Sequence, residues 1–439
     1  MDKLIRGLNL WQAVAVNTID MVGIGPFVTL SFIMGAMSGP LCLLAWLMGA
    51  LLAFADGAVW AELGAKWPEA GGSYVFLQKL YGENKGGRLM AFLFTWQTII
   101  QAPLVIASGA IGFSMYLTYL LPLSTLGQKA VSGVLVMLVT AMLYRKITDI
   151  GKISLAFGSV VVVTIIWIIA GGFTHFNSAM AFALPQSGVH FDGAFFKSLG
   201  SAGTKAIYCY LGYYNVCHLG AEIKSPERNI PRSIFLSVAI IAVLYLLMQT
   251  AVLGVVPWLE AKDSSFIISL FIEKTYGPYA AQVATALILL IAVSSLFAVM
   301  LGYSRVPYAA AANGNFFRVF SKLHPTKHFP HVSLLVLGAV AFVFSLLFKM
   351  KEVITAIIVM RILVQFVAQA LGIMAWHQKH KTETMPYRMW LFPLPPLAAI
   401  GIWLFIFFSA DWVYIAAALG IIATGGLLYF IKERFSRAI

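Results

Sequence analysis

The chain has 439 residues, of which 60% are hydrophobic and only 11% are charged, and its formal net charge is +13. This composition excludes an ordinary soluble globular protein and indicates a chain that crosses a membrane many times. In a soluble protein, a charge of +13 would favour nucleic acid or an acidic partner. Here the basic residues follow the predicted spans, so we expect no nucleic-acid partner.

Runs of about 20 apolar residues, the length needed to cross the hydrocarbon core of a bilayer, occur about twelve times. The sequence therefore predicts an all-α polytopic membrane protein whose residues 1–439 form a single membrane domain. In chain order, the predicted spans cover residues 8–34, 39–64, 87–121, 126–144, 150–174, 195–221, 233–257, 279–312, 331–349, 352–377, 387–409 and 411–431.

Most of the basic residues lie on one side of these spans. If the N-terminus is cytoplasmic, 21 of the 30 lysines and arginines fall in cytoplasmic segments and seven on the opposite side, while Lys152 and Arg361 fall within spans. Such an excess in cytoplasmic loops is the positive-inside rule. The distribution predicts a multi-pass protein of the plasma membrane, surrounded by lipids, with both termini in the cytoplasm. The short tails favour a prokaryotic protein.

Two of the predicted spans are interrupted near their middles. The first contains Gly23, Gly25 and Pro26, and the sixth contains Gly212 among polar neighbours. Unpaired backbone is tolerated in hydrocarbon only where it lines a cavity or is buried in protein. Glycines also allow close helix packing, but Pro26 and the matching places of the two breaks favour broken helices. Paired broken helices indicate a binding site near the middle of the membrane.

The two breaks divide the spans into two sets of five. Residues 8–174 form the first set and residues 195–377 the second, and each set begins with a broken member. Because five is odd, the second set enters the membrane from the opposite side, so the two sets are predicted to be inverted repeats. Residues 387–431 supply two further helices outside the repeats.

Five motifs in this order resemble the amino acid–polyamine–organocation transporter superfamily, especially its L-type amino acid exchanger branch. The resemblance covers nearly the whole chain and implies the LeuT-type fold of two intertwined five-helix repeats. The motifs are residues 22–27 (VGIGPF), 67–74 (WPEAGGSY), 222–232 (EIKSPERNIPR), 302–305 (GYSR) and 386–388 (PYR).

The first break offers groups that suit the two charged ends of an amino acid. A new half-helix after residue 22 has free N–H groups and a positive dipole end, both of which favour an anion. We therefore expect the amides of Gly23, Ile24 and Gly25 to hold a carboxylate. The carbonyl of Met21, which ends the preceding half-helix, would suit the ammonium group.

The resemblance assigns further substrate-binding residues to the sixth span. The carbonyls of Tyr208 and Leu211 and the break at Gly212 are implied to contact the substrate. Tyr208 matches the aromatic gate of the family, and this role is favoured over the alternative of an interfacial or packing tyrosine. Asn215 matches a polar position of the bacterial exchangers, and the alternative for it is an interhelical hydrogen bond.

Lys152 lies near the start of the fifth predicted span. A lysine there usually extends its ammonium group to the membrane interface. The resemblance instead implies that Lys152 occupies the space of a sodium ion and contacts helix 1 carbonyls, which would make transport independent of sodium.

Asp20 and Arg361 are charges within predicted spans, and such charges cost about 3 kcal/mol or more unless they are paired or hydrated. Asp20 could select a cationic substrate, carry a proton, or form a structural ion pair with Arg361. No histidine or cysteine spacing indicates a metal site or a cofactor, and no catalytic residues are expected.

The resemblance implies a secondary transporter that moves L-amino acids, with neutral ones favoured, by alternating access. Exchange and proton coupling both remain open, as does the oligomeric state. An alternative is a transporter of cationic amino acids or polyamines that uses Asp20. A channel or a membrane-embedded enzyme is disfavoured, because the sequence shows neither repeated pore loops nor a catalytic constellation.

Overall fold

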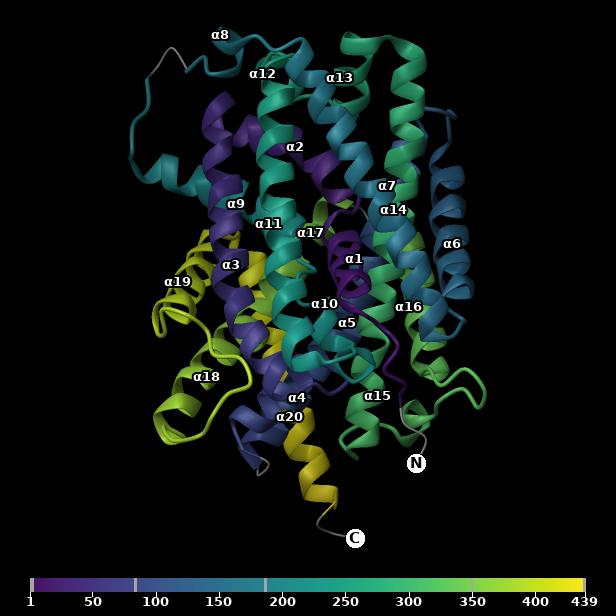
Figure 1. The fold of residues 1–439 in the computed structure, drawn as a ribbon, viewed down its shortest axis with the longest axis vertical. Helices are drawn as coiled ribbons and strands as arrows, with labels where there is room; N and C mark the ends of the chain where they lie inside the picture. Colours follow the sequence, from purple (N-terminus) through teal and green to yellow (C-terminus); the bar gives the residue numbers. More distant parts are fainter. Residues whose placement is uncertain (1–3, 83–84, 185–187, 349, 437–439) are drawn as a thin grey trace.

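A computed structural model describes residues 4–82, 85–184, 188–348 and 350–436, and within these ranges the chain forms a bundle of helices with two isolated β-bridges. Most helices run along the long axis of the bundle (Figure 1). In the first half these are α1 (Leu10–Met21), α2 (Gly25–Met37), η1 (Gly39–Leu41), α3 (Cys42–Lys66), α4 (Ser73–Leu80), α5 (Lys85–Leu117), α6 (Thr125–Met142), α7 (Ile147–Thr174) and α8 (Ser178–Ala181).

The second half begins with another broken helix and ends with a long helix on the flank of the bundle. Its helices are α9 (Gly193–Tyr210), α10 (Asn215–His218), η2 (Gly220–Glu222), α11 (Pro226–Leu253), α12 (Trp258–Ala261), α13 (Ile267–Tyr276), α14 (Pro278–Tyr303), α15 (Arg305–Ala312), η3 (Arg318–Ser321), α16 (His331–Leu347), α17 (Met350–Arg361), η4 (Ile362–Val367, a π-helix), α18 (Ala368–Lys379), α19 (Leu394–Ser409) and α20 (Trp412–Ser436).

The described residues contain eight helices that are long and apolar enough to cross a membrane, and a ninth span if α1 and α2 are counted together. The shorter apolar helices α16 and α19 and the broken pair α9 and α10 occupy the remaining predicted spans. The prediction of an all-α polytopic membrane protein is confirmed. The division into two inverted repeats stays a prediction.

Two predicted boundaries are wrong by seven residues. Helix α11 begins at Pro226 rather than at 233, because its polar first two turns extend beyond the apolar stretch that reveals a span in the sequence. Helix α19 begins at Leu394 rather than at 387, with prolines in its first turn, where a missing N–H costs nothing.

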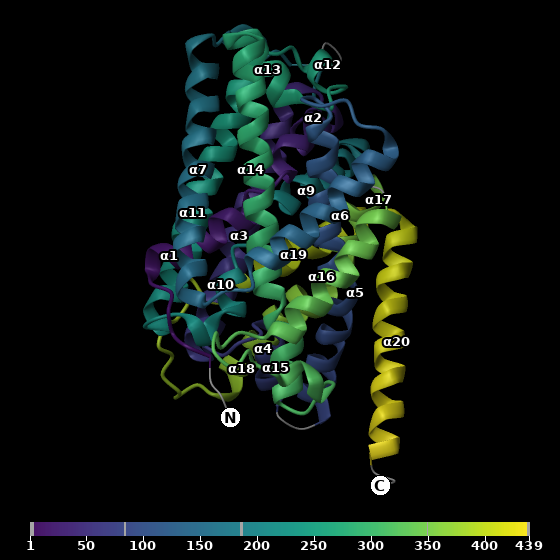
Figure 2. The ribbon, with the colours of Figure 1, turned by 90° about the vertical axis from the view of Figure 1, so that its right-hand side faces the viewer.

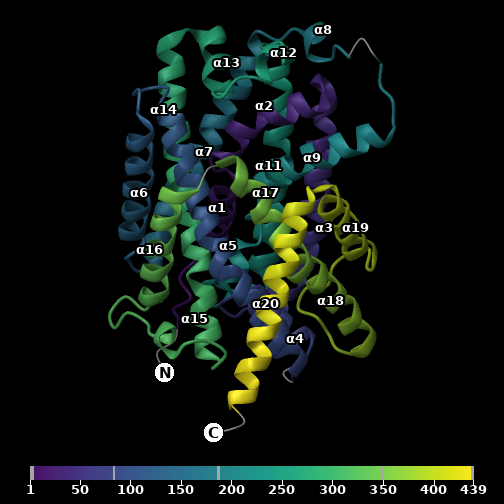
Figure 3. The ribbon, with the colours of Figure 1, turned by 180° about the vertical axis from the view of Figure 1, so that it is seen from behind.

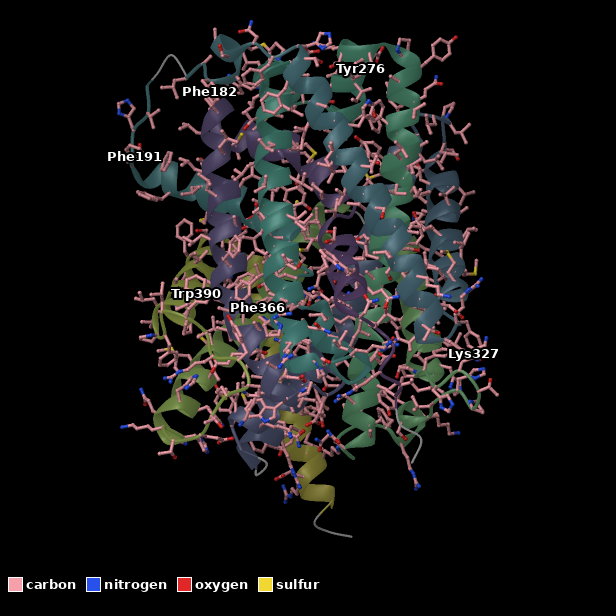
Figure 4. The ribbon with its side chains drawn as sticks, viewed as in Figure 1. Phe182, Phe191, Tyr276, Lys327, Phe366 and Trp390 are labelled. Atoms are coloured by element: carbon pink, nitrogen blue, oxygen red, sulfur yellow. The ribbon has the colours of Figure 1, made fainter. Side chains whose placement is uncertain are left out.

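Both chain ends lie at the same end of the bundle, which we call the termini face (Figures 1 and 3). Helix α20 runs along an outer flank, where it packs against α5 and α17 (Figure 2). In Figure 4, Lys327 lies toward the termini face, whereas Phe182, Phe191 and Tyr276 lie at the opposite end. Nitrogen-bearing side chains gather toward the termini face in the same view.

At the termini face, the segment before α1 is tied to the end of the sixth span. The amides of Gly7 and Leu8 donate to the carbonyl of Glu222, and the amide of Lys224 donates to the carbonyl of Leu8. The carboxylate of Glu222 also forms a buried, two-pronged ion pair with Arg305, with N–O distances of 2.8 and 2.9 Å. These contacts hold the first, sixth and eighth spans together at this face.

Candidate functional site

The two broken spans meet directly. Helices α1 and α2 are bent by 47° across their break, and the α9–α10 break carries Gly212 with a φ of +122°. A Cβ on Gly212 would lie 2.8 Å from both Asp20 Cγ and Met21 N. Only glycine combines this backbone conformation with so close an approach, so the sequence brings the two breaks into contact at this residue.

A cavity of about 60 Å³ lies at this meeting point, between α1, α2, α5, α9, α14 and α17. At roughly 15 Å³ for each water molecule, it has room for about four waters or a small solute. Seven of the eight substrate-binding residues predicted from the sequence line it, and so do both intramembrane charges. These nine residues are Met21, Gly23, Ile24, Gly25, Tyr208, Leu211, Gly212, Asp20 and Arg361.

The first break leaves backbone donors free beside the cavity. Within the described chain, the N–H groups of Gly23 and Ile24 have no hydrogen-bond acceptor. A Cβ on Gly23 would lie 2.6 Å from Ser295 Oγ, and one on Gly25 would lie 2.9 Å from Tyr208 Cε1. The glycines therefore allow close packing, and the break leaves the N–H groups of Gly23 and Ile24 at the cavity, while their binding of a carboxylate stays a prediction.

The carbonyl end of the break is partly occupied by the protein itself. The Tyr245 hydroxyl lies 2.9 Å from the carbonyl oxygen of Met21 and 3.1 Å from that of Cys209, and so bridges the ends of α1 and α9. The Met21 carbonyl, which was expected to suit an ammonium group, therefore already accepts one hydrogen bond, although a carbonyl oxygen has a second lone pair. Within the described residues, no hydrogen bond reaches the Leu211 carbonyl.

Asp20 and Arg361 share the cavity without forming an ion pair. Among the described residues, their nitrogen and oxygen atoms are not within 4.0 Å of each other. The Arg361 guanidinium still acts on the Asp20 carboxylate through space, and the Asn215 side chain also lies near it. The direct structural pair that the sequence suggested is absent from this conformation, and both charges face the cavity instead.

Tyr208 reaches from α9 to α5, where its hydroxyl lies 3.2 Å from Ser108 Oγ. Asn215 does not line the cavity; its Nδ2 donates to the carbonyl of Ala298 on α14 at 2.8 Å. The interhelical hydrogen bond, which was the alternative for Asn215, is therefore present. Asn17 makes a similar contact, because its side-chain oxygen accepts from the Val216 amide at 3.0 Å.

Lys152 is not brought to the site. Its side chain is exposed on the second turn of α7, whereas the preceding residue faces α1. A Cβ on Gly151 would lie 2.7 Å from Leu8 Cδ2 and 2.9 Å from the Gln12 side chain. Successive helical residues point about 100° apart, so Lys152 is turned away from the α1 carbonyls that it was expected to contact. The exposed side chain agrees with the alternative considered for Lys152, in which its ammonium group extends toward the membrane interface.

The sequence analysis did not assign several polar residues that line the cavity, among them Tyr214, Ser295 and Tyr303. A serine or tyrosine within an apolar span is a weak signal, because its direction cannot be read from its position. Among the described residues, no group of three histidine, cysteine or acidic side chains could hold a metal ion.

A family described as amino acid permease matches residues 8–431, nearly the whole chain. The chain belongs to the amino acid permease family. The permease is 23% identical to the branched-chain amino acid permease BcaP of Bacillus subtilis over 93% of its own length and 86% of that protein. It is 25% identical to the serine/threonine exchanger SteT of the same organism, over 91% and 90% of the two chains.

Another relative is cationic amino acid transporter 4 of Mus musculus, which is 24% identical over 80% of the permease and 57% of that protein. Family membership confirms the resemblance to the amino acid–polyamine–organocation superfamily. It makes the chain a multi-pass membrane transporter of the amino acid permease type and not an enzyme. The substrates in these names differ in charge and size, so they leave the side chain of its substrate open.

Proposed function

We propose that the permease binds an L-amino acid where the two broken spans meet and carries it across the membrane by alternating access. The observation that carries this proposal is the pair of unpartnered amides, Gly23 and Ile24, beside the cavity. They directly precede Gly25, the first residue of helix α2, whose positive dipole end favours a carboxylate. The 60 Å³ cavity suits a small solute in this conformation.

Three oxygen groups are available for the ammonium group of the substrate. The Asp20 carboxylate lines the cavity, the Met21 carbonyl keeps one lone pair, and the Leu211 carbonyl is free within the described chain. Tyr208 spans the side of the cavity between α9 and α5 and would close over the substrate.

A cationic amino acid or a polyamine fits this cavity less well. Arg361 is buried and lines the same cavity as Asp20, so a second positive charge would be repelled at short range in a medium of low dielectric constant. Asp20 as a cation-selecting group is therefore disfavoured, and its possible role as a proton carrier remains a prediction.

A binding titration on detergent-purified protein tests the carboxylate site. Gly23→Val and Gly25→Val should lower amino acid affinity sharply, because a branched Cβ would fill the space beside the amides. Gly401→Val is the matched control, since a Cβ there meets nothing within 4 Å. An amino acid whose α-carboxylate is converted to an amide should compete poorly.

Wild-type affinity in both valine variants, at matched thermal stability, would contradict the carboxylate site.

Uptake into proteoliposomes, measured with sodium or choline and with or without a pH gradient, distinguishes sodium coupling, proton coupling and exchange. Independence from sodium stays a prediction that Lys152 no longer supports.

A further inference from the structure

One charged group of the cavity is held in place but lacks a full set of partners. Arg361 has only 3% of its surface exposed, and within the described chain its Nη2 atom has no hydrogen-bond partner. The guanidinium carbon lies 5.2 Å from the ring centre of Tyr214, 5.4 Å from that of Tyr303 and 5.5 Å from that of Phe366. Its Nε donates to Gln365 Oε1 at 2.5 Å.

The backbone around Arg361 is also fixed. Arg361 is the last residue of α17, and the chain continues as the π-helix Ile362–Val367; such helices occur frequently at functional sites. The Gln97 side chain on α5 donates to the carbonyl of Met360 at 2.8 Å. Aromatic faces stabilise the charge of a guanidinium but do not replace an oxygen acceptor in the plane of its N–H groups. The unpartnered Nη2 is therefore a positioned donor for an anion.

The cavity thus has two separate places for negative charge and one for positive charge. The amides of Gly23 and Ile24 form the first anion site and Arg361 the second, while the Asp20 carboxylate suits an ammonium group. A neutral amino acid has one carboxylate and would leave Arg361 unused.

We propose that Arg361 binds a second carboxylate, so that the substrate is a dicarboxylic L-amino acid. This inference rests on the proposed function, because it takes the α-carboxylate to be bound at the first break. Arg361 recognises the side-chain carboxylate through charge-assisted hydrogen bonds, for which the planar guanidinium is well suited.

The affinities of the purified wild type for aspartate and asparagine, and for glutamate and glutamine, give the sharpest test. Each pair has nearly the same shape and differs in one negative charge. A hydrogen bond to a charged group corresponds to about 10- to 100-fold in affinity. Each acid should therefore bind at least about 10-fold more tightly than its amide. Alanine and lysine complete the series and should bind more weakly than aspartate.

Two substitutions of Arg361 test whether this residue causes the preference for an acid over its amide. Arg361→Gln should abolish the difference between aspartate and asparagine, and Arg361→Lys should keep part of it, because the charge remains but the fork of donors is lost. Lys327→Gln removes the same charge toward the termini face (Figure 4), where Lys327 Nζ donates to the Tyr144 carbonyl. This control should bind like the wild type.

The outcomes separate the inference from the proposed function. If the wild type binds alanine or asparagine as tightly as aspartate, the second carboxylate site is wrong while amino acid binding stands. An unchanged acid preference in a folded Arg361→Gln protein would also overturn the inference. If no amino acid binds the wild type, the proposed function itself fails. Should Arg361→Gln not fold, Arg361→Lys and the wild-type acid and amide pairs still decide.

Discussion

Tyr245 shows how a single hydroxyl group holds the joint between the two broken spans. It lies within hydrogen-bonding distance of the carbonyls that end α1 and α9, and its side chain is fully buried. A hydroxyl donates one proton at a time, so these two carbonyls share one donor. In the proposed binding mode, the position of the substrate's ammonium group therefore depends on a residue that lies outside the cavity.

Tyr245→Phe should loosen this joint. Removing a buried donor leaves carbonyl oxygens unsatisfied, at a cost of about 1 to 3 kcal/mol. We expect a lower melting temperature in detergent and weaker substrate binding. Tyr279→Phe is the matched control, because Tyr279 is 84% exposed. An unchanged melting temperature and affinity in Tyr245→Phe would show that its hydroxyl does not support the joint.

At the scale of elements, the breaks could be located from the sequence because glycine and proline mark them directly. Gly23, Gly25 and Gly212 stand where the helices are interrupted. The direction in which the Lys152 side chain points could not be predicted from the sequence. If the helical register of α7 is assigned one residue off, the side chain is placed about 100° away around the helix. The hydrogen-bond partners of the Tyr245 hydroxyl could not be predicted either, because they lie 36 and 224 positions away in the chain.

Gly212→Ala tests the contact between the two breaks. The substitution combines a strained positive φ, which costs on the order of 1 kcal/mol, with a clash against Asp20 and Met21. Gly277→Ala is a matched control, because Gly277 has a φ of +87° but a Cβ there meets nothing within 4 Å. Gly212→Ala should lower the melting temperature and the transport rate more than Gly277→Ala. Equal effects of the two would mean that strain alone matters.

At the scale of the whole molecule, the positive-inside distribution and the shared position of the termini favour one orientation. We expect the termini face to lie in the cytoplasm. Lys381 follows α18, which lies toward the termini face, and Lys262 follows α12, which lies at the opposite end (Figure 1); both positions are exposed and suit substitution by cysteine. The native cysteines, Cys42, Cys209 and Cys217, are buried and should label poorly.

A membrane-impermeant maleimide applied to intact cells should therefore label Lys262→Cys and spare Lys381→Cys until the membrane is permeabilised. The reverse pattern would place the termini outside the cell. Retained uptake in both variants is the control that each protein is folded and inserted.

The Glu222–Arg305 pair has a consequence for the energy of transport. If the chain alternates access, the termini face must open and admit water to these charges. A dry ion pair and two hydrated ions differ little in free energy, because the Coulomb attraction lost on opening is offset by hydration. A seal of packed apolar side chains would instead favour the closed form in proportion to its area. Under the proposed alternating access, we therefore expect the pair to act as a reversible seal, one that closes a pathway without trapping the protein in a single state.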